Sequence, residues 1–270
     1  GSRMEGLLNM GEGEDLVTLR AGSMLTGDVR MGAGNDRVAI AENVLQGSVF
    51  LEDGDDIILL DRLFSTVNID GGQGNDTAEY TTIAGESSAL DLGAFSFSNV
   101  ETFAQQGPGQ LTVTSDRSDF TRYELRGGVL NLNATLPNLS LFTFAGTRLA
   151  VQGTVGSLTM DGGVVAPGAD ANDGSGIGTL TINGDFTLNA NSTLEVQVDA
   201  AGNNDVVMVN GTVNLGGATL SAKEIGDFSG EDPFNYVIIR NNGAAAISGT
   251  FGAIRNEYAF LTPTVGYAGG

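Results

Sequence analysis

Four aspartates recur at nearly constant spacing near the start of the chain. The steps between them are 21, 20 and 20 residues, and a glycine stands two positions before each one. Glycine accepts the positive φ of a tight turn, and an aspartate side chain can cap that turn or attract a cation. The pattern is carried by Gly13 and Asp15, Gly34 and Asp36, Gly54 and Asp56, and Gly74 and Asp76.

Short apolar alternations surround each of these turns, as in LVTL (16–19), RVAI (37–40) and DIILL (56–60). A fixed period of about 20 residues in glycine-rich, β-branched sequence indicates a solenoid. Two strands and two turns per period predict an all-β fold, a right-handed parallel β-helix. The side chains expected to point into its core are Val17, Leu19, Val29, Met31, Val38, Ile40, Val49, Leu51, Ile58 and Leu60.

Stacked rungs would bring equivalent turns to about 4.8 Å from one another, in one column. Two unit charges about 5 Å apart repel by roughly 0.8 kcal/mol in water and about 3 kcal/mol at an effective dielectric constant of 20. The column therefore requires raised pKa values, splayed side chains or a bound cation. Its acids are Glu12, Glu14, Asp15, Asp36, Glu52, Asp53, Asp55, Asp56, Asp70 and Asp76, partly offset by Arg30 and Arg37.

The turn GGQGNDTAE (71–79) resembles the repeats-in-toxin nonapeptide, whose turns bind Ca²⁺ between rungs. MGAGNDRVA and MGEGEDLVT match it with Met in place of the first glycine, and LEDGDDIIL lacks both of the first two glycines. The resemblance implies Ca²⁺ as the cofactor and Asp15, Asp36, Asp56 and Asp76 as its ligands. The alternative is that these turns are β-helix corners and bind nothing.

Composition excludes several kinds of chemistry. The chain has 270 residues with no Cys, His or Trp, and Lys223 is its single lysine. Without His, Ser-His-Asp and Cys-His catalysis are excluded; a Ser-Lys arrangement would depend on Lys223, which we expect in a loop. The net charge of −21 disfavours nucleic acids and anionic membranes, and no apolar stretch is long enough to insert into a bilayer. The initial Gly-Ser resembles a cloning scar, with residues 1–4 as a linker.

The C-terminal third resembles the passenger-associated repeat of autotransporters, the type V secreted proteins of Gram-negative bacteria. The motifs stand in order: Ala166-Pro167-Gly168, IGTLTINGDFTL (177–188), STLEVQVD (192–199) and NNDVVMVNGTVNLGGATL (203–220). The segment 236–270 is similar to the one that precedes the membrane barrel in that family. The resemblance implies a C-terminal cap that promotes folding during export, the autochaperone.

The strand pattern of this third agrees with a cap, since the exposed end of a solenoid invites aggregation. Its expected core residues are Leu180, Ile182, Phe186, Leu188, Leu194, Val196, Val198, Val206, Met208, Val213 and Leu215, and its expected cap aromatics are Phe228, Phe234, Tyr236, Phe251, Tyr258 and Phe260. We divide the chain into rungs with aspartate turns (5–100), further rungs (101–160) and the cap (161–270). Ser175, which has no base, is interpreted as a loop residue, and GNND (202–205) as a single corner.

Together these features predict a non-enzymatic passenger fragment with no catalytic residues. It would be secreted or held at the cell surface by its own membrane barrel, which is absent from this chain, and would contact a host-cell or matrix component. Two alternatives remain. A β-helical polysaccharide lyase would use Arg30 or Arg37 as its base beside the acids, and a calcium-dependent toxin fragment would use the same turns.

Overall fold

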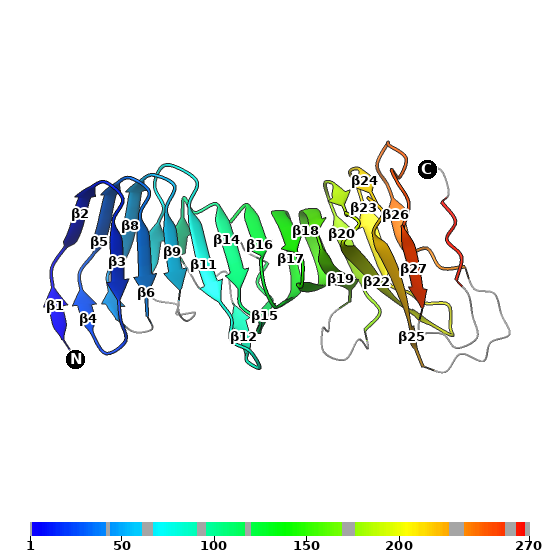
Figure 1. The fold of residues 1–270 in the computed structure, drawn as a ribbon, viewed down its shortest axis with the longest axis horizontal. Coiled ribbons are helices and arrows are strands. Elements are labelled where there is room, and N and C mark those ends of the chain that lie inside the picture. Colours follow the sequence, from blue (N-terminus) through cyan, green and yellow to red (C-terminus); the bar gives the residue numbers. More distant parts are fainter. Residues whose placement is uncertain are drawn as a thin grey trace.

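The chain forms a parallel β-helix, described by a computed structural model for residues 2–41, 44–60, 67–90, 96–116, 120–168, 176–226, 235–256 and 263–267. Within these ranges the regular structure is strand only, and every pairing between named strands is parallel. The rungs follow one another along a rod with the two termini at opposite ends (Figure 1). The predicted all-β solenoid is confirmed. The described residues contain no helix that is long and apolar enough to cross a membrane.

The strands form three columns, so a rung contains three strands where the sequence predicted two. We call the columns faces A, B and C in the order in which each rung visits them. Face A contains β1 (Arg3–Glu5), β4 (Met24–Thr26), β7 (Leu45–Gln46), β12 (Ser87–Leu90), β15 (Gln110–Val113), the first parts of β17 (Val129–Phe144) and β18 (Arg148–Asp161), β19 (Gly163–Pro167), β22 (Ser192–Asp199), β25 (Thr219–Ile225) and β27 (Ala253–Asn256).

Face B contains β2 (Leu8–Glu12), β5 (Val29–Ala33), β8 (Ser48–Asp53), β10 (Asn68–Asp70), β13 (Ser96–Ser98), the middle parts of β17 and β18, β20 (Thr179–Ile182), β23 (Val206–Val209) and β26 (Ile239–Asn241). Face C contains β3 (Leu16–Leu19), β6 (Arg37–Ile40), β9 (Ile57–Leu60), β11 (Thr77–Thr81), β14 (Thr102–Gln106), β16 (Arg122–Leu125), the last parts of β17 and β18, β21 (Phe186–Thr187) and β24 (Val213–Asn214).

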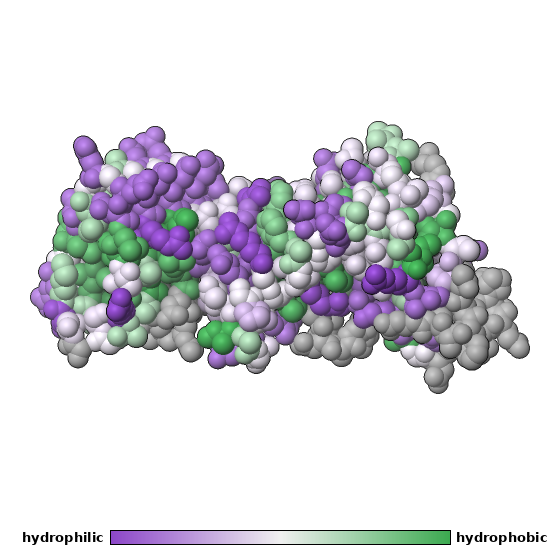
Figure 2. Space-filling model, in the orientation of Figure 1, coloured by the Kyte–Doolittle hydropathy of each residue, from purple (hydrophilic) through white to green (hydrophobic). Residues whose placement is uncertain are grey.

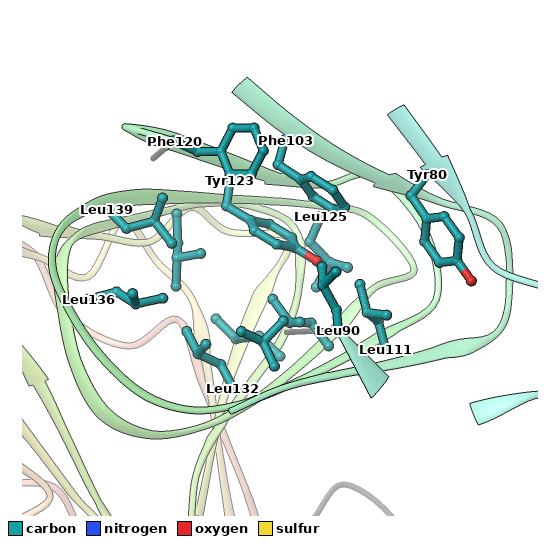
Figure 3. Close-up of a cluster of buried hydrophobic side chains, with 14 of the residues drawn as sticks. Tyr80, Leu90, Phe103, Leu111, Phe120, Tyr123, Leu125, Leu132, Leu136 and Leu139 are labelled. Atoms are coloured by element: carbon teal, nitrogen blue, oxygen red, sulfur yellow. The ribbon is translucent and has the colours of Figure 1, made fainter. Parts of the chain in front are cut away.

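One apolar core runs inside the three faces. Of the ten residues predicted for the N-terminal core, nine are buried and Leu19 is partly buried because it lies in the first rung. In the middle rungs aromatic rings join leucines in the core. Ring centroids lie 4.8 Å apart for Phe97 and Phe120, and 5.3 Å apart for Phe103 and Tyr123, of which Phe103, Phe120 and Tyr123 are labelled in Figure 3. The Tyr123 hydroxyl donates a hydrogen bond of 2.9 Å to Gln105, so this buried polar pair is satisfied.

The prediction of the C-terminal core is wrong for two residues. Val206 and Met208 are only partly buried, and Val207 and Val209 point into the core instead. The reason is Asp205, whose carboxylate is buried and accepts hydrogen bonds from the Gly178 and Gln197 amides, each at 2.8 Å. Because side chains alternate along a strand, an inward residue 205 places residues 207 and 209 inward as well.

The cap aromatics are only partly described. Tyr236 donates a hydrogen bond of 2.7 Å to the Asp199 carbonyl, and Phe251 packs against the core. Phe228, Phe234, Tyr258, Phe260 and Ser175 lie outside the described residues. The domain boundaries at 100/101 and 160/161 stay predictions.

Candidate functional site

The four predicted aspartates are brought together in one column, at the corner where face B passes into face C. We call this column, Asp15, Asp36, Asp56 and Asp76, the aspartate ladder. Asp36, Asp56 and Asp76 each accept a hydrogen bond from the backbone amide of the equivalent aspartate one rung earlier. The amide-to-Oδ1 distances are 2.7 Å from Asp15 to Asp36, 2.6 Å from Asp36 to Asp56 and 2.8 Å from Asp56 to Asp76. The ladder therefore fastens neighbouring rungs together.

Glu101 is a fifth member that the repeat pattern missed. Its Oε2 accepts the Asp76 amide at 2.8 Å, across 25 residues. No glycine-aspartate turn marks this position, and the connection is longer than in the preceding rungs. The only available signal is its place directly before the face C strand β14, and the longer glutamate side chain makes the bond that an aspartate makes elsewhere.

The residues before the last three ladder aspartates form a second column, in which the first two side chains each accept a backbone amide from the following rung and not from the preceding one. Asn35 Oδ1 accepts the Asp55 amide, and Asp55 Oδ1 accepts the Asn75 amide, both at 2.9 Å. These side chains are exposed, and each reaches towards the following rung. The recurrent Asn-Asp or Asp-Asp pair is thus explained, because its first residue caps the next rung and its second caps the previous one.

The glycines of the turns are required by both conformation and space. Gly34, Gly54 and Gly74 have φ values of 135°, 147° and 138°. A Cβ at any of them would overlap the carbonyl of the glycine one rung earlier. In the neighbouring column of Gly11, Gly32 and Gly72, Glu52 takes the place of a glycine with φ of 78°, and its carboxylate pairs with Arg30 at 2.6 Å. The predicted role of these glycines in the corner is confirmed.

Burial dominates the electrostatics of the ladder. Asp36, Asp56 and Asp76 are 2%, 0% and 0% exposed, and the Oδ2 atom of each is buried without a hydrogen-bond partner. Loss of solvation raises the pKa of Asp56 and of Asp76 to about 6. The hydrogen bond that each carboxylate accepts from a backbone amide lowers its pKa, and the neighbouring carboxylates raise it. The pKa of Asp36 is raised for the same reasons.

The ladder can therefore hold protons near neutral pH, or offer its open Oδ2 atoms to a cation. Among the described residues no three acidic side chains converge in a group that would by itself hold a metal ion. Any cation at this corner would need backbone carbonyls or water in addition to the carboxylates, as hard cations commonly have.

The arginines named for lyase chemistry lie on different faces. Arg30 is on face B, where it stacks on Phe50 at 4.5 Å, and Arg37 is on face C, 3.4 Å from the Glu79 carboxylate. Glu79 also binds Arg126 at 2.8 Å, and Arg126 binds Glu124 at 2.7 Å. Both guanidinium groups are thus held by carboxylates, Arg30 by Glu52 and Arg37 by Glu79, and they do not face a common site.

Lys223 lies in β25 and not in the loop that its polar neighbours predict. Its ammonium is 2.9 Å from Glu195, which Arg148 also binds at 2.5 Å. These two cations lower the pKa of Glu195 against the opposing effect of its burial. Polar residues in this stretch are outward residues of a strand, because alternation places one side of β25 outside the core.

Comparison with known proteins adds no family. No family model matches the chain, and no curated protein sequence matches it.

Proposed function

We propose that this chain is a non-enzymatic passenger fragment of a Gram-negative autotransporter, which presents a long acidic surface to a host-cell or matrix component. The observation that carries the proposal is the continuous stack of parallel rungs from β1 to β27, which extends a short repeat into a rod. The ordered motifs between residues 162 and 222 support the family. The charge of −21 favours a soluble surface outside the cell and opposes contact with anionic lipid.

The C-terminal rungs are proposed to promote folding during export. Their support is the long parallel register between β22 and β25, over a core that includes Leu194 and Leu220. The test fuses the chain to an outer-membrane anchor in a Gram-negative host and measures its exposure to added protease. Leu194→Asn should abolish surface exposure, whereas the neighbouring Thr193→Asn, on the outward side of the same strand, should leave it intact. Equal export of both variants would contradict the proposal.

The adhesion part has a separate test. The purified chain is added to cultured host cells and to immobilised matrix proteins, and its binding is compared with that of an unrelated acidic protein. Binding above that control is expected. Efficient export together with no binding would remove adhesion and leave only the secretion role.

A second candidate is calcium binding at the aspartate ladder, and the buried, unpartnered Oδ2 atoms of Asp36, Asp56 and Asp76 favour it. A ligand that binds only the folded state adds about 2.7 kcal/mol at 100 times its Kd. The melting temperature in millimolar Ca²⁺ should therefore be several degrees higher than in EDTA. The double variant Asp56→Asn with Asp76→Asn should remove this difference. No shift in the parent chain would assign the ladder to corner formation alone.

A further inference from the structure

The outer side of face C carries an apolar strip in its first three strands. The parallel register aligns Leu16 with Arg37 and Ile57, and Thr18 with Ala39 and Leu59. Their neighbours Val17, Val38 and Ile58 point into the core. We call Leu16, Ala39, Ile57 and Leu59 the apolar strip. In β9 all four residues are apolar, a composition typical of a strand that is covered on both faces.

The strip is open to solvent along its N-terminal side. Leu16 is 65% exposed, and Figure 2 shows a hydrophobic area over the N-terminal rungs with a hydrophilic border along the corner above it. Arg37 lies in β6 and pairs with Glu79 in β11, so its side chain crosses β9 and leaves Ile57 and Leu59 half-buried. Single exposed apolar residues are ordinary, but an apolar area that spans three neighbouring strands, here with Arg37 between Leu16 and Ile57, marks an interaction surface.

The charge beside the strip defines the chemistry of what would cover it. Exposed carboxylates stand on the corner directly before β3 and β9, at Glu12, Glu14, Asp53 and Asp55. Of the nearby arginines, Arg30 and Arg37 are paired with Glu52 and Glu79, and the exposed Arg20 lies beyond the opposite end of β3 from this corner. A partner therefore meets apolar side chains beside uncompensated negative charge, which favours basic residues and repels phosphate backbones and anionic membranes.

We propose that the apolar strip and the adjoining acidic corner form a docking surface for a cationic, amphipathic segment of another protein. This rests on the proposed function, since it specifies the chemical class of the partner that the rod would contact. Apolar side chains of the segment cover Leu16, Ile57 and Leu59, and its basic side chains face Glu14, Asp53 and Asp55.

The test uses two synthetic 12-residue peptides, one of alternating Lys and Leu and one of alternating Lys and Gln, with Kd measured by fluorescence anisotropy. The Lys-Leu peptide should bind the parent chain at least tenfold more tightly than the Lys-Gln peptide, a difference of about 1.4 kcal/mol. Leu16→Ser with Leu59→Ser should remove this preference. Ile83→Ser, at a residue that is 53% exposed outside the strip, should retain it.

Equal binding of the two peptides, or an unchanged preference in the double variant, would overturn the proposal. If the double variant fails to fold, Leu16→Ser alone replaces it, because Leu16 is 65% exposed and its truncation removes an apolar side chain of the strip without changing the core. Self-association that depends on Leu16, measured by sedimentation, would assign the strip to a second copy and also overturn the proposal. None of these measurements involves export or cells, so their failure is distinct from failure of the passenger proposal.

Discussion

The corner between faces B and C carries a column of carboxylates in the N-terminal rungs, and a column of side-chain amides beside the single carboxylate of Asp185 in the described C-terminal rungs. In the C-terminal rungs Asn183, Asn210 and Asn242 stack at this corner, each followed by glycine. Asn242 donates to Asn210 at 3.2 Å, and Asn210 donates to Asn183 at 3.3 Å. An amide both donates and accepts, so this column pairs with itself, whereas an ionised carboxylate only accepts and must take backbone amides.

The two solutions differ in what they leave open. The asparagines are exposed, and water can complete their hydrogen bonds. Asp36, Asp56 and Asp76 are buried and keep one unpartnered oxygen each, at a cost in free energy that a proton or a cation would relieve. The same corner therefore contains buried aspartates with raised pKa values in one region, and in the other it contains exposed asparagines and the exposed Asp185, whose pKa the Thr212 amide and hydroxyl lower.

The largest expected effect comes from the glycines that both corners need. Gly54→Ala should cost about 3–4 kcal/mol, because the position combines positive φ with overlap on the Gly34 carbonyl. Gly211→Ala should cost about 2 kcal/mol, because its Cβ overlaps the Gly184 carbonyl but its φ is outside the left-handed region. Gly13→Ala is the control: it has a φ of 117° with open space around it, and should cost about 1 kcal/mol. Urea unfolding measures the loss in free energy of unfolding for all three variants. Equal losses would show that overlap with the preceding rung does not contribute to the cost of these substitutions.

The second prediction concerns pH. The folded pKa of Asp56 and of Asp76 is about 6, above the unfolded value, so the folded state binds more protons between the two. Stability in EDTA should therefore rise by about 1–3 kcal/mol as pH falls from 8 to 5. Asp56→Asn with Asp76→Asn keeps the acceptors and removes the charges, so most of the slope should disappear. Asp205, whose pKa burial raises to about 6, and Asp36, whose pKa burial also raises, should account for what remains.

An unchanged slope in the double variant would contradict this account of the ladder. Further acidification, below about pH 4.5, should lower the stability again. Glu124 and Glu195 have pKa values lowered by their arginine and lysine partners, so the stability they contribute is lost as they become protonated. Unfolding curves at half-unit pH intervals would separate the two regimes.

The sequence could predict the ladder because glycine, aspartate and a constant period act locally. It could not predict Glu101, since the connection before it lengthens and a different side chain makes the same bond. The sequence also could not predict which residues of VVMV (206–209) point into the core. Four apolar residues in a row show no alternation, and the buried Asp205 determines which of them face inward. The Arg37–Glu79 pair depends on the register of strands 42 residues apart, which composition does not contain.

The smallest expected effect tests whether burial, and not charge alone, separates the two columns. Asn210→Asp keeps the oxygen that accepts from Asn242 but removes the amide that donates to Asn183, at an exposed site. Water can take the lost bond, so the variant should lose about 0.5 kcal/mol at pH 7. Asp55→Asn, the reverse exchange in the exposed N-terminal column, should change stability by less than about 0.5 kcal/mol. If Asn210→Asp lowers the free energy of unfolding by about 2 kcal/mol or more, even an exposed corner does not tolerate a charge. Burial would then not be the reason why the ladder aspartates respond to pH.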